Sequence, residues 1–362
     1  MKKILFIIPS FRRGGVETIT LNIINSLNNK ELDIILLVCS GSNNTLLNDI
    51  RSSIKIIELH KKNVRGALPE VFKILKKEKP NSVFTSFNHL SLPIITYKYI
   101  SKSTYKTIVR INSLPSNDLN SNFRGKLYNK LFSKLIRKAD IIISQTEEMK
   151  IDICNYYKLK SEKVQTIRNI IDFDRIEQQS KSLITESIKG PDTFSFIAIG
   201  SLGEVKGFDL LIRAIHNLIN KNITNIRLFI IGDNRESNED YRSKLEKLIL
   251  KLELKNYVVL LGFKKNPYPY LKQGDAFVLS SRKEGFPNVV LEALSLNKPC
   301  LVTNCVDFTG IINNNINGVI VQKNSIEALE AGILEIQKIN HIDNSKILNN
   351  FNFDYNKWFQ AI

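Results

Sequence analysis

Two glutamates that flank a short turn are the residues whose types and spacing best suit chemistry. Glu284 and Glu292 stand eight positions apart within SSRKEGFPNVVLEALSLNKPCLVTN, residues 280–304. Pro287 suits the start of a helix, where its missing N–H costs nothing, and the apolar spacing after it predicts a helix over 288–296. Carboxylates can hold sugar hydroxyls, and the free N–H groups of a helix N-terminus can bind a diphosphate. The segment therefore predicts a site for a sugar nucleotide.

The same stretch resembles the E-x7-E signature, typically EGFPNVLLEA, of the retaining glycosyltransferases of family 4. A plain loop followed by an amphipathic helix, with Glu292 facing solvent, is the simpler alternative. The resemblance implies a GT-B fold: two Rossmann-like, doubly wound α/β domains that face each other across a cleft. It also implies that the donor is bound by Arg282, Glu284, Gly285, Phe286, Pro287, Asn288, Val289 and Glu292, with Glu284 taking part in catalysis.

Length and composition fit two ordinary globular domains. The chain has 362 residues, of which 43% are hydrophobic, and it holds no apolar run near the ~20 residues needed to span a bilayer. We expect a cytoplasmic protein. The formal net charge of +17 favours an anionic partner, whether nucleic acid, a membrane surface or a phosphorylated substrate. No aromatic-rich RNA-binding motif or helix-turn-helix pattern accompanies that charge, so we expect no nucleic-acid partner.

Short apolar runs alternate with segments of helical spacing, and this alternation predicts parallel sheets buried on both faces. The expected strands are 3–10, 33–40, 54–59, 81–87, 106–112 and 139–146, and then 193–200, 226–233, 257–263, 275–281, 300–304 and 318–322. We expect an acceptor-binding domain over 1–170, a polar linker over 171–192 and a nucleotide-sugar domain over 193–345. Residues 346–362 form a C-terminal helix that could return to the first domain.

The loop PSFRRGGVET, residues 9–18, follows the first strand. Gly14 and Gly15 would let backbone N–H groups approach a ligand, as the glycine-rich loop does in family 4, although such a turn between strand and helix is also ordinary. Arg12 and Arg13 could bind an anionic acceptor. His89 follows a strand, as a histidine near the reacting sugar often does in this family, and a capping or core histidine is the alternative.

Residues 199–209, IGSLGEVKGFD, carry a Lys-Gly element that matches the one in family 4, whose lysine contacts the donor diphosphate. Lys206 at a helix start would oppose the helix dipole, which suggests a bound anion; a solvated lysine is the alternative. Ser201 stands where the family usually has an arginine. Arg282 or Lys283 could compensate for that missing phosphate contact.

The remaining predicted site residues come at strand ends. Gly232, Gly262 and Phe263 end two strands of the second half, at the edge where the family surrounds the nucleotide base. Arg110 and Asn112 follow a strand of the first half and are expected to bind the acceptor.

No metal or cofactor is expected. The only D-x-D, Asp172 to Asp174, lies in the predicted linker and suits a turn or a helix cap. Four scattered cysteines, without a histidine cluster, predict free thiols rather than a disulfide or a structural zinc site.

Residues 123–141 predict a basic amphipathic helix. An apolar stripe of Phe123, Leu127, Leu131, Leu135 and Ile136 is surrounded by Lys126, Lys130, Lys134, Arg137 and Lys138. A normally packed helix with a solvated face is one explanation. Contact with anionic lipid at the inner face of the cytoplasmic membrane is the other.

Together these features predict a retaining glycosyltransferase, a hexosyl- or N-acetylhexosaminyltransferase of bacterial surface polysaccharide synthesis. It would move a sugar from a nucleoside diphosphate, expected to be UDP, to a hydroxyl of a glycan or lipid-linked acceptor. A sugar-nucleotide epimerase or phosphorylase of the same fold, or a basic nucleic-acid-binding protein, remains an alternative. A nicotinamide oxidoreductase is disfavoured because PSFRRGGVE lacks the G-x-G-x-x-G loop.

Overall fold

The protein is described from a computed structural model. It covers residues 1–12, 14–27, 31–41, 44–117, 123–234, 240–339, 342, 344 and 355–362, with only the backbone described at 117, 123–126, 355 and 356. The chain folds into two compact units. The first comprises residues 1–170 together with 351–362, and the second comprises residues 171–350.

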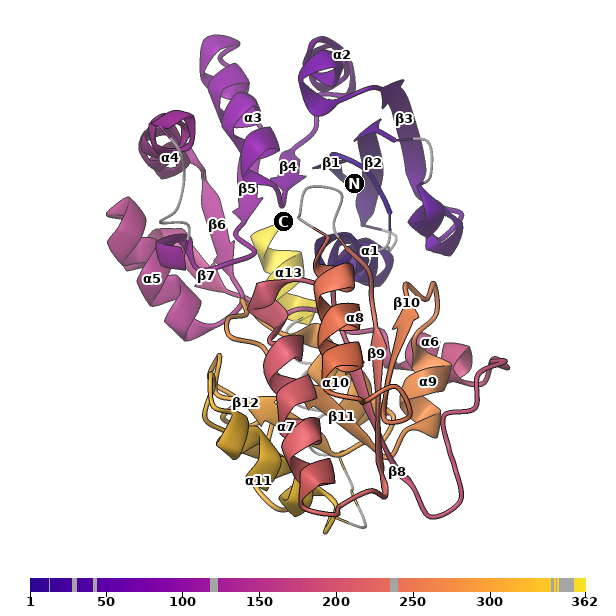
Figure 1. Cartoon of the computed structure of the whole chain (residues 1–362). Helices are drawn as coiled ribbons and strands as arrows, with labels where there is room; N and C mark the ends of the chain where they lie inside the picture. Colours follow the sequence, from indigo (N-terminus) through magenta and orange to yellow (C-terminus); the bar gives the residue numbers. More distant parts are fainter. Residues whose placement is uncertain are drawn as a thin grey trace. The chain divides into compact units, whose positions relative to one another are not determined.

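The first unit is a parallel sheet of seven strands in the order β3-β2-β1-β4-β5-β6-β7 (Figure 1). Its strands are β1 Lys2–Ile8, β2 Leu32–Ser40, β3 Lys55–Lys61, β4 Ser82–Thr85, β5 Lys106–Arg110, β6 Ile141–Ser144 and β7 Val164–Thr166. Its helices are α1 Gly15–Leu27, α2 Val64–Glu78, α3 Asn88–Ile100, α4 Phe123–Leu135, α5 Glu147–Tyr157 and α13 Tyr355–Ala361. Short 3-10 turns span η1 Thr45–Asp49, η2 Pro115–Asn117, η3 Ile136–Lys138 and η4 Ser161–Lys163.

Helices cover both faces of this sheet, which is why its strands read as continuous apolar runs. Leu5 of β1 points into a core shared with Ile94 of α3. The next residue, Phe6, points to the opposite face, where its ring lies 4.9 Å from that of Phe84. Phe84 in turn contacts the ring of Trp358 in α13. The last helix of the chain therefore completes the core of the first unit.

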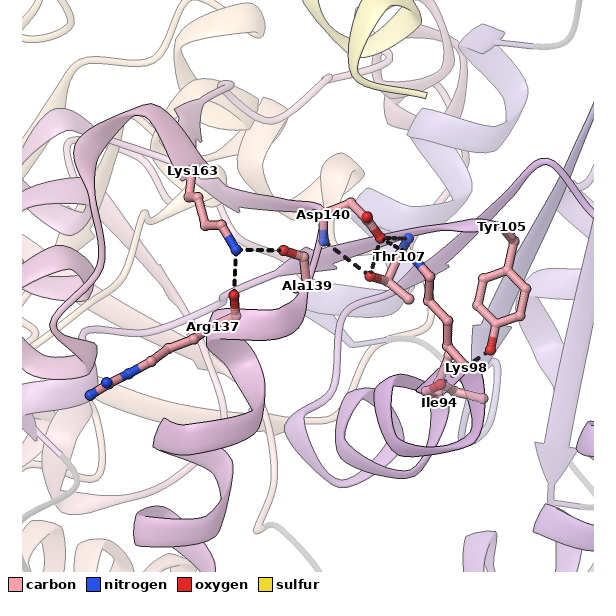
Figure 2. A network of polar contacts seen from close by, with 8 residues as sticks. All are labelled: Ile94, Lys98, Tyr105, Thr107, Arg137, Ala139, Asp140 and Lys163. Carbon is pink, nitrogen blue, oxygen red and sulfur yellow. Dashed lines mark hydrogen bonds and ion pairs between the residues drawn. The ribbon is translucent and has the colours of Figure 1, made fainter. Parts of the chain in front are cut away.

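A polar network fixes α3 against the start of β5 (Figure 2). The Lys98 ammonium lies 2.6 Å from Oδ2 of Asp140, and the backbone N–H and the hydroxyl of Thr107 each donate to that same oxygen at 2.7 Å. Burial acts to raise the pKa of Asp140, but these hydrogen bonds outweigh it and lower the pKa. The Tyr105 hydroxyl donates to the Ile94 carbonyl at 3.2 Å. The position of α3 is thereby set at its C-terminal half.

The second unit is a parallel sheet of six strands in the order β10-β9-β8-β11-β12-β13. Its strands are β8 Phe194–Ile199, β9 Ile226–Ile231, β10 Val258–Gly262, β11 Ala276–Leu279, β12 Cys300–Thr303 and β13 Gly318–Val321. Its helices are α6 Phe173–Ser180, α7 Phe208–Asn220, α8 Tyr241–Lys251, α9 Tyr268–Gln273, α10 Asn288–Ser295 and α11 Ile326–Ile336, with one 3-10 turn, η5 Glu204–Lys206. The prediction of two doubly wound parallel sheets is confirmed.

The segment 171–192 is more than the polar linker that the sequence predicts. It contains α6, whose Ile176 is buried and which packs against α9 and α10. Asp172 caps this helix by accepting a hydrogen bond from the Arg175 amide at 3.0 Å, as expected for a capping residue. Two further elements were not predicted: β7, which has only three residues, and α5, whose hydrophobic face is short.

All four cysteines carry free thiols, as predicted. Among the described residues, no helix is long and apolar enough to cross a membrane.

Candidate functional site

The second sheet reverses its winding direction between β8 and β11, which are neighbours in the sheet but not in the chain. Ligands of open α/β sheets bind outside the carboxyl ends of strands at such a point. Two loops leave the sheet there: 200–207 after β8, and 280–287 after β11. They carry the Lys-Gly element and the first part of the E-x7-E segment, so the fold brings together two motifs almost eighty residues apart in the sequence.

An ion pair joins these two loops. Nζ of Lys206 lies 2.6 Å from Oε1 of Glu284, and the Ser281 hydroxyl donates to the same oxygen at 2.7 Å. Both charged side chains are mostly buried, with 20% and 14% of their surface exposed. A β-carbon at Gly200 would lie 3.1 Å from Cε of Lys206, so the glycine leaves room for the stem of the lysine. The predicted catalytic lysine and glutamate therefore form one pair.

The glycine of the Lys-Gly element is required by the backbone. Gly207 has a φ of +65°, and a β-carbon there would lie 2.1 Å from the carbonyl oxygen of Ser280. The hydroxyl of Ser280 donates back to the Lys206 carbonyl at 2.9 Å. This close approach locks the loop after β8 onto the loop after β11. Lys206 itself ends the 3-10 turn η5 rather than beginning a helix as predicted, because Gly207 intervenes before α7.

Arg282, one of the two residues predicted to compensate for the arginine that Ser201 replaces, has an acidic partner. Its guanidinium forms two hydrogen bonds of 2.8 Å with the carboxylate of Asp209 in α7, and it also donates to the Glu204 carbonyl. Burial acts to raise the pKa of Asp209, but the hydrogen bonds and charge of Arg282 lower it. Asp209 therefore neutralises Arg282, and a contact between Arg282 and a donor phosphate stays a prediction. Lys283 is exposed.

The N-terminus of α10 lies directly after the loop that carries Glu284. Pro287 takes the N-cap position, one residue earlier than predicted, and its side chain forms no capping hydrogen bond. Asn288 and Val289 begin the helix, and the amides of Asn288 and Val290 already donate to the carbonyls of Phe286 and Pro287, at 3.1 and 3.0 Å. That the remaining N–H groups of this first turn bind the diphosphate stays a prediction. Glu292 lies one turn further along, half-buried, as the spacing predicted. Its role toward the donor ribose stays a prediction, as do those of Gly285 and Phe286.

Two more glycines bring strand ends together at the same edge. Gly232 has a φ of +152°, and a β-carbon there would lie 1.8 Å from the carbonyl oxygen of Gly200. The Gly232 amide donates to the Gly262 carbonyl at 3.0 Å. Phe263 follows with 59% of its surface exposed. An exposed aromatic ring beside converging backbone is suited to contact a flat nucleotide base.

The other predicted residues belong to the first unit. Gly15 begins α1, and a β-carbon there would meet no atom within 4 Å, while one at Gly14 would meet only the carboxylate of Glu17. The loop therefore does not depend on glycine for its shape, although its backbone is accessible. Arg12 is exposed, and Arg13 lies outside the described residues.

His89 lies in the first turn of α3 and faces an apolar groove of about 870 Å³ between α2, α3 and α4. Loss of hydration lowers its pKa, so the ring is neutral at pH 7. The groove, which also includes Leu68, Phe72 and Ile100, is a feature that sequence reasoning missed. The residues that line the groove come from three helices, so the sequence of a single helix does not predict it.

Arg110 ends β5 and is buried, with 2% of its surface exposed. It donates to the side-chain oxygen of Asn112 and, at 2.6 Å, to that of Asn169. Asn112 donates in turn to the Ser86 carbonyl. The structure thus brings the two predicted acceptor residues together, but Arg110 lies beneath the surface and only Asn112 lines a pocket there. Among the described residues, no three His, Cys, Asp or Glu side chains gather in a possible metal site.

The chain is similar to known proteins over both of its units. Residues 180–350 match the family model of group 1 glycosyl transferases, and residues 13–175 match that of glycosyltransferase family 4. An uncharacterised glycosyltransferase of Methanocaldococcus jannaschii is 34% identical over 243 residues, which are 65% of this chain and 58% of that relative. A Campylobacter jejuni N-acetylgalactosaminyltransferase, named for a diphospho-undecaprenol acceptor, is 32% identical over 189 residues, 52% of this chain and 47% of that relative. The chain thus spans about half of the length of these curated relatives.

Solved structures share the fold. HepE from Anabaena, in complex with UDP and glucose, superposes with a TM-score of 0.76 at 18% identity, covering 100% of this chain and 96% of that one. A glycosyltransferase from Rickettsia africae gives a TM-score of 0.73 at 20% identity, covering 99% and 94%. Both halves of the chain thus match glycosyltransferase models, and each half folds as a doubly wound sheet. The chain belongs to the family 4-like glycosyltransferases, and its two units are the Rossmann-like domains of the GT-B fold.

Proposed function

We propose that this protein transfers a sugar from a UDP-sugar to a hydroxyl group of a lipid-linked glycan, with retention of configuration at the anomeric carbon. The observation that carries the proposal is the Lys206–Glu284 pair at the reversal point of the second sheet, beside the N-terminus of α10. A cation and a helix N-terminus can together bind a diphosphate, and carboxylates can accept hydrogen bonds from sugar hydroxyls.

Catalysis by this site consists of stabilising the departing diphosphate. As the bond between the anomeric carbon and the phosphate oxygen breaks, negative charge grows on the diphosphate. Lys206 and the backbone N–H groups near Asn288 would stabilise that charge. The acceptor hydroxyl attacks the anomeric carbon on the same face, and its proton passes to the leaving diphosphate. Retention then needs no enzyme nucleophile. Glu284 holds Lys206 in place at 2.6 Å.

The choice of donor and acceptor is supported by the relatives. Anabaena HepE was solved with UDP and glucose. The Campylobacter relative and an Escherichia coli galactosyltransferase, 27% identical over 221 residues, are both named for diphospho-undecaprenol acceptors. The E. coli enzyme is also named for UDP-galactose. A UDP-sugar and a lipid diphosphate are therefore the substrates to test first.

A membrane role for the first unit is part of the proposal. Leu127 and Leu131 of α4, two members of the predicted apolar stripe, are 61% and 48% exposed, while Ile136 of the same stripe is buried, as is Phe132. The exposed leucines lie one turn apart on a helix whose exposed residues also include Lys130 and Lys134. Apolar side chains among cations suit the boundary between anionic headgroups and acyl chains. We place the enzyme at the cytoplasmic face of the membrane, near its acceptor.

The donor experiment incubates the protein with a panel of nucleoside diphosphate sugars and measures protection against heat together with released nucleoside diphosphate. We expect one UDP-sugar to stabilise the fold and to be hydrolysed slowly without acceptor. Failure of every sugar nucleotide to bind would contradict the proposal.

Sedimentation with liposomes tests the membrane role. Binding should require anionic lipid and weaken as salt rises, since each cation near the surface contributes about 1 kcal/mol. Replacement of Lys126, Lys130 and Lys134 by glutamine should release the protein, whereas the same change at Lys338 and Lys221, on the second unit, should not. Wild-type protein that stays in the supernatant at low salt would exclude this role.

A further inference from the structure

A second polar site lies in the first unit, between β4 and β5, next to the point where its sheet reverses direction from β1 to β4. A pocket of about 200 Å³ opens at the carboxyl ends of β4 and β5, and Ser86, Asn88, Asn112 and Ser113 contribute to its polar lining. None of the donor-site residues described above in the second unit belongs to it. Like the Lys206–Glu284 site of the second sheet, it lies at the carboxyl ends of parallel strands.

The hydroxyl of Ser86 is buried without a partner. Only 1% of the residue's surface is exposed, and its Oγ has no hydrogen-bond partner among the described residues. Folding leaves few buried hydroxyl groups unsatisfied, because each one has lost its hydrogen bonds to water. Since Ser86 lines the pocket, this hydroxyl lies in the pocket wall, and a small movement of the side chain would let it donate to a ligand held there.

The pocket also lies above an unneutralised positive charge. Among the described residues, no carboxylate pairs with the guanidinium of Arg110, whose partners are the amide oxygens of Asn112 and Asn169. Its Nε has no partner. Burial lowers the pKa of Arg110 to about 9, which still leaves the group protonated at pH 7. A buried cation without a counter-ion favours an anion nearby.

The N-terminus of α3 adds a third contribution. This helix of thirteen residues begins at Asn88, and Phe87 at its N-cap offers no capping side chain. Phe87 and Asn88 both line the pocket, so the positive end of the helix dipole is directed to it. The next residue, His89, lines the apolar groove. Consecutive residues in the first turn of one helix thus line the polar pocket and the apolar groove.

We infer that this pocket binds the phosphate or diphosphate group that links the acceptor's sugar to its lipid, while the adjoining apolar groove takes the start of the hydrocarbon chain. The inference rests on the proposed function, because it specifies the acceptor of that reaction. Ser86 and the first-turn amides of α3 would donate to phosphate oxygens. Arg110 is a positioning residue: it orients the amide of Asn112 and supplies the positive charge beneath the site.

The experiment measures binding by calorimetry with UDP present in saturating amount, so that the donor site is filled. The probes are inorganic pyrophosphate, decyl diphosphate and, as the uncharged match, decyl maltoside. We expect decyl diphosphate to bind more tightly than pyrophosphate, because only it also fills the groove, and decyl maltoside to bind weakly. Equal binding of pyrophosphate and decyl diphosphate would indicate a site for free phosphate and contradict the lipid assignment.

Ser86→Ala gives the sharpest test. Loss of one hydrogen bond to a charged group should weaken decyl diphosphate binding about 10-fold. The same change removes an unsatisfied buried hydroxyl, so the melting temperature without ligand should stay equal or rise, opposite to what a purely structural role would give. Ser52→Ala, at an exposed serine of the first unit away from the pocket, is the matched control and should alter neither value.

Arg110→Lys and Arg110→Gln test the charge. Both lose the hydrogen bonds to Asn112 and Asn169, but only the glutamine variant loses the cation, so binding should fall further in Arg110→Gln. Unaltered binding of decyl diphosphate in Ser86→Ala would overturn the inference even if the arginine variants fail to fold. Donor binding distinguishes the two hypotheses: if UDP-sugar still binds and is hydrolysed while the lipid probe does not bind, only this inference fails.

Discussion

The two sheets present different sites at the carboxyl ends of their strands. In the second sheet, the two partly buried cations of the loops each have a carboxylate partner: Lys206 pairs with Glu284, and Arg282 with Asp209. In the first sheet, at the ends of β4 and β5, Arg110 has no carboxylate partner among the described residues, and the Ser86 hydroxyl has no hydrogen-bond partner there. The buried cations of the second unit are thus neutralised within the fold, and Arg110 of the first unit is not.

This difference separates two ways of holding an anion. In the second unit, pairing positions the cation in advance and limits its repulsion from α10's N-terminus, and a diphosphate must compete with Glu284 for Lys206. In the first unit, an unpaired cation and an unsatisfied hydroxyl lower the free energy of unfolding. Binding of an anion would offset that loss of stability. Variants of single residues can test whether each unit behaves in this way.

The largest effect is expected from Lys206→Ala. The charge that Lys206 stabilises grows in the transition state, so its loss should reduce turnover by about 10²–10³-fold, while donor affinity falls less. Steady-state kinetics with the donor identified by the sugar-nucleotide panel would measure both. Lys338→Ala removes an exposed lysine paired with Glu335 and serves as the control. Full turnover in Lys206→Ala would mean that another group stabilises the diphosphate.

Glu284→Gln is expected to show the next largest effect, because it leaves Lys206 without its anionic partner. The ammonium should then be less well positioned, and turnover should fall about 10-fold, corresponding to one hydrogen bond to a charged group. If pairing competes with the donor, affinity for UDP should rise in the same variant. Calorimetry with UDP checks this, and a fall in UDP affinity would contradict the competition.

Glu292→Ala should weaken donor binding several-fold and leave the fold intact, since a half-buried glutamate on a helix contributes little to stability. The proposed contact is with the ribose hydroxyls. Deoxyribose analogues of UDP sharpen the test: the variant and the wild type should bind them equally. A variant that binds UDP as the wild type does would remove Glu292 from the site.

Asp209→Asn should lower the free energy of unfolding by about 1–2 kcal/mol at pH 7, because Arg282 then lacks its counter-ion. The folded-state pKa of Asp209 is lowered, so its stabilisation is present above the unfolded value near 3.9 and is lost as pH falls through the folded value. Urea unfolding should therefore show a gap between wild type and variant that closes in acid. A gap that persists in acid where Asp209 is protonated in the folded protein would point to packing instead.

The smallest expected effect is that of a chelator. We propose that no divalent metal is required, because Asp172 caps α6 and the described residues form no metal cluster. Activity should be unchanged by EDTA. Loss of activity that manganese restores would show that the diphosphate is neutralised by a metal and that Lys206 is secondary.

The sequence by itself determined the architecture and the donor half of the site. Continuous apolar strands require cover on both faces, so the parallel sheets follow from the chain alone. EGFPN and Lys-Gly are local motifs, because a turn, a glycine with positive φ and a helix start are specified by neighbouring residues. Glu284, Lys206 and Glu292 could therefore be predicted as site residues from the sequence, and the fold brings the first two together.

Only the tertiary structure decided which charges are free. Arg282 and Asp209 lie far apart in the sequence, and their pairing depends on how α7 packs beside the loop after β11. No sequence motif marks Ser86. The residue matters because its hydroxyl has no hydrogen-bond partner among the described residues, and this depends on which groups pack around it. The apolar groove likewise joins three helices. Hydrogen-bond satisfaction and burial are set by contacts between distant segments, and local sequence patterns do not encode them.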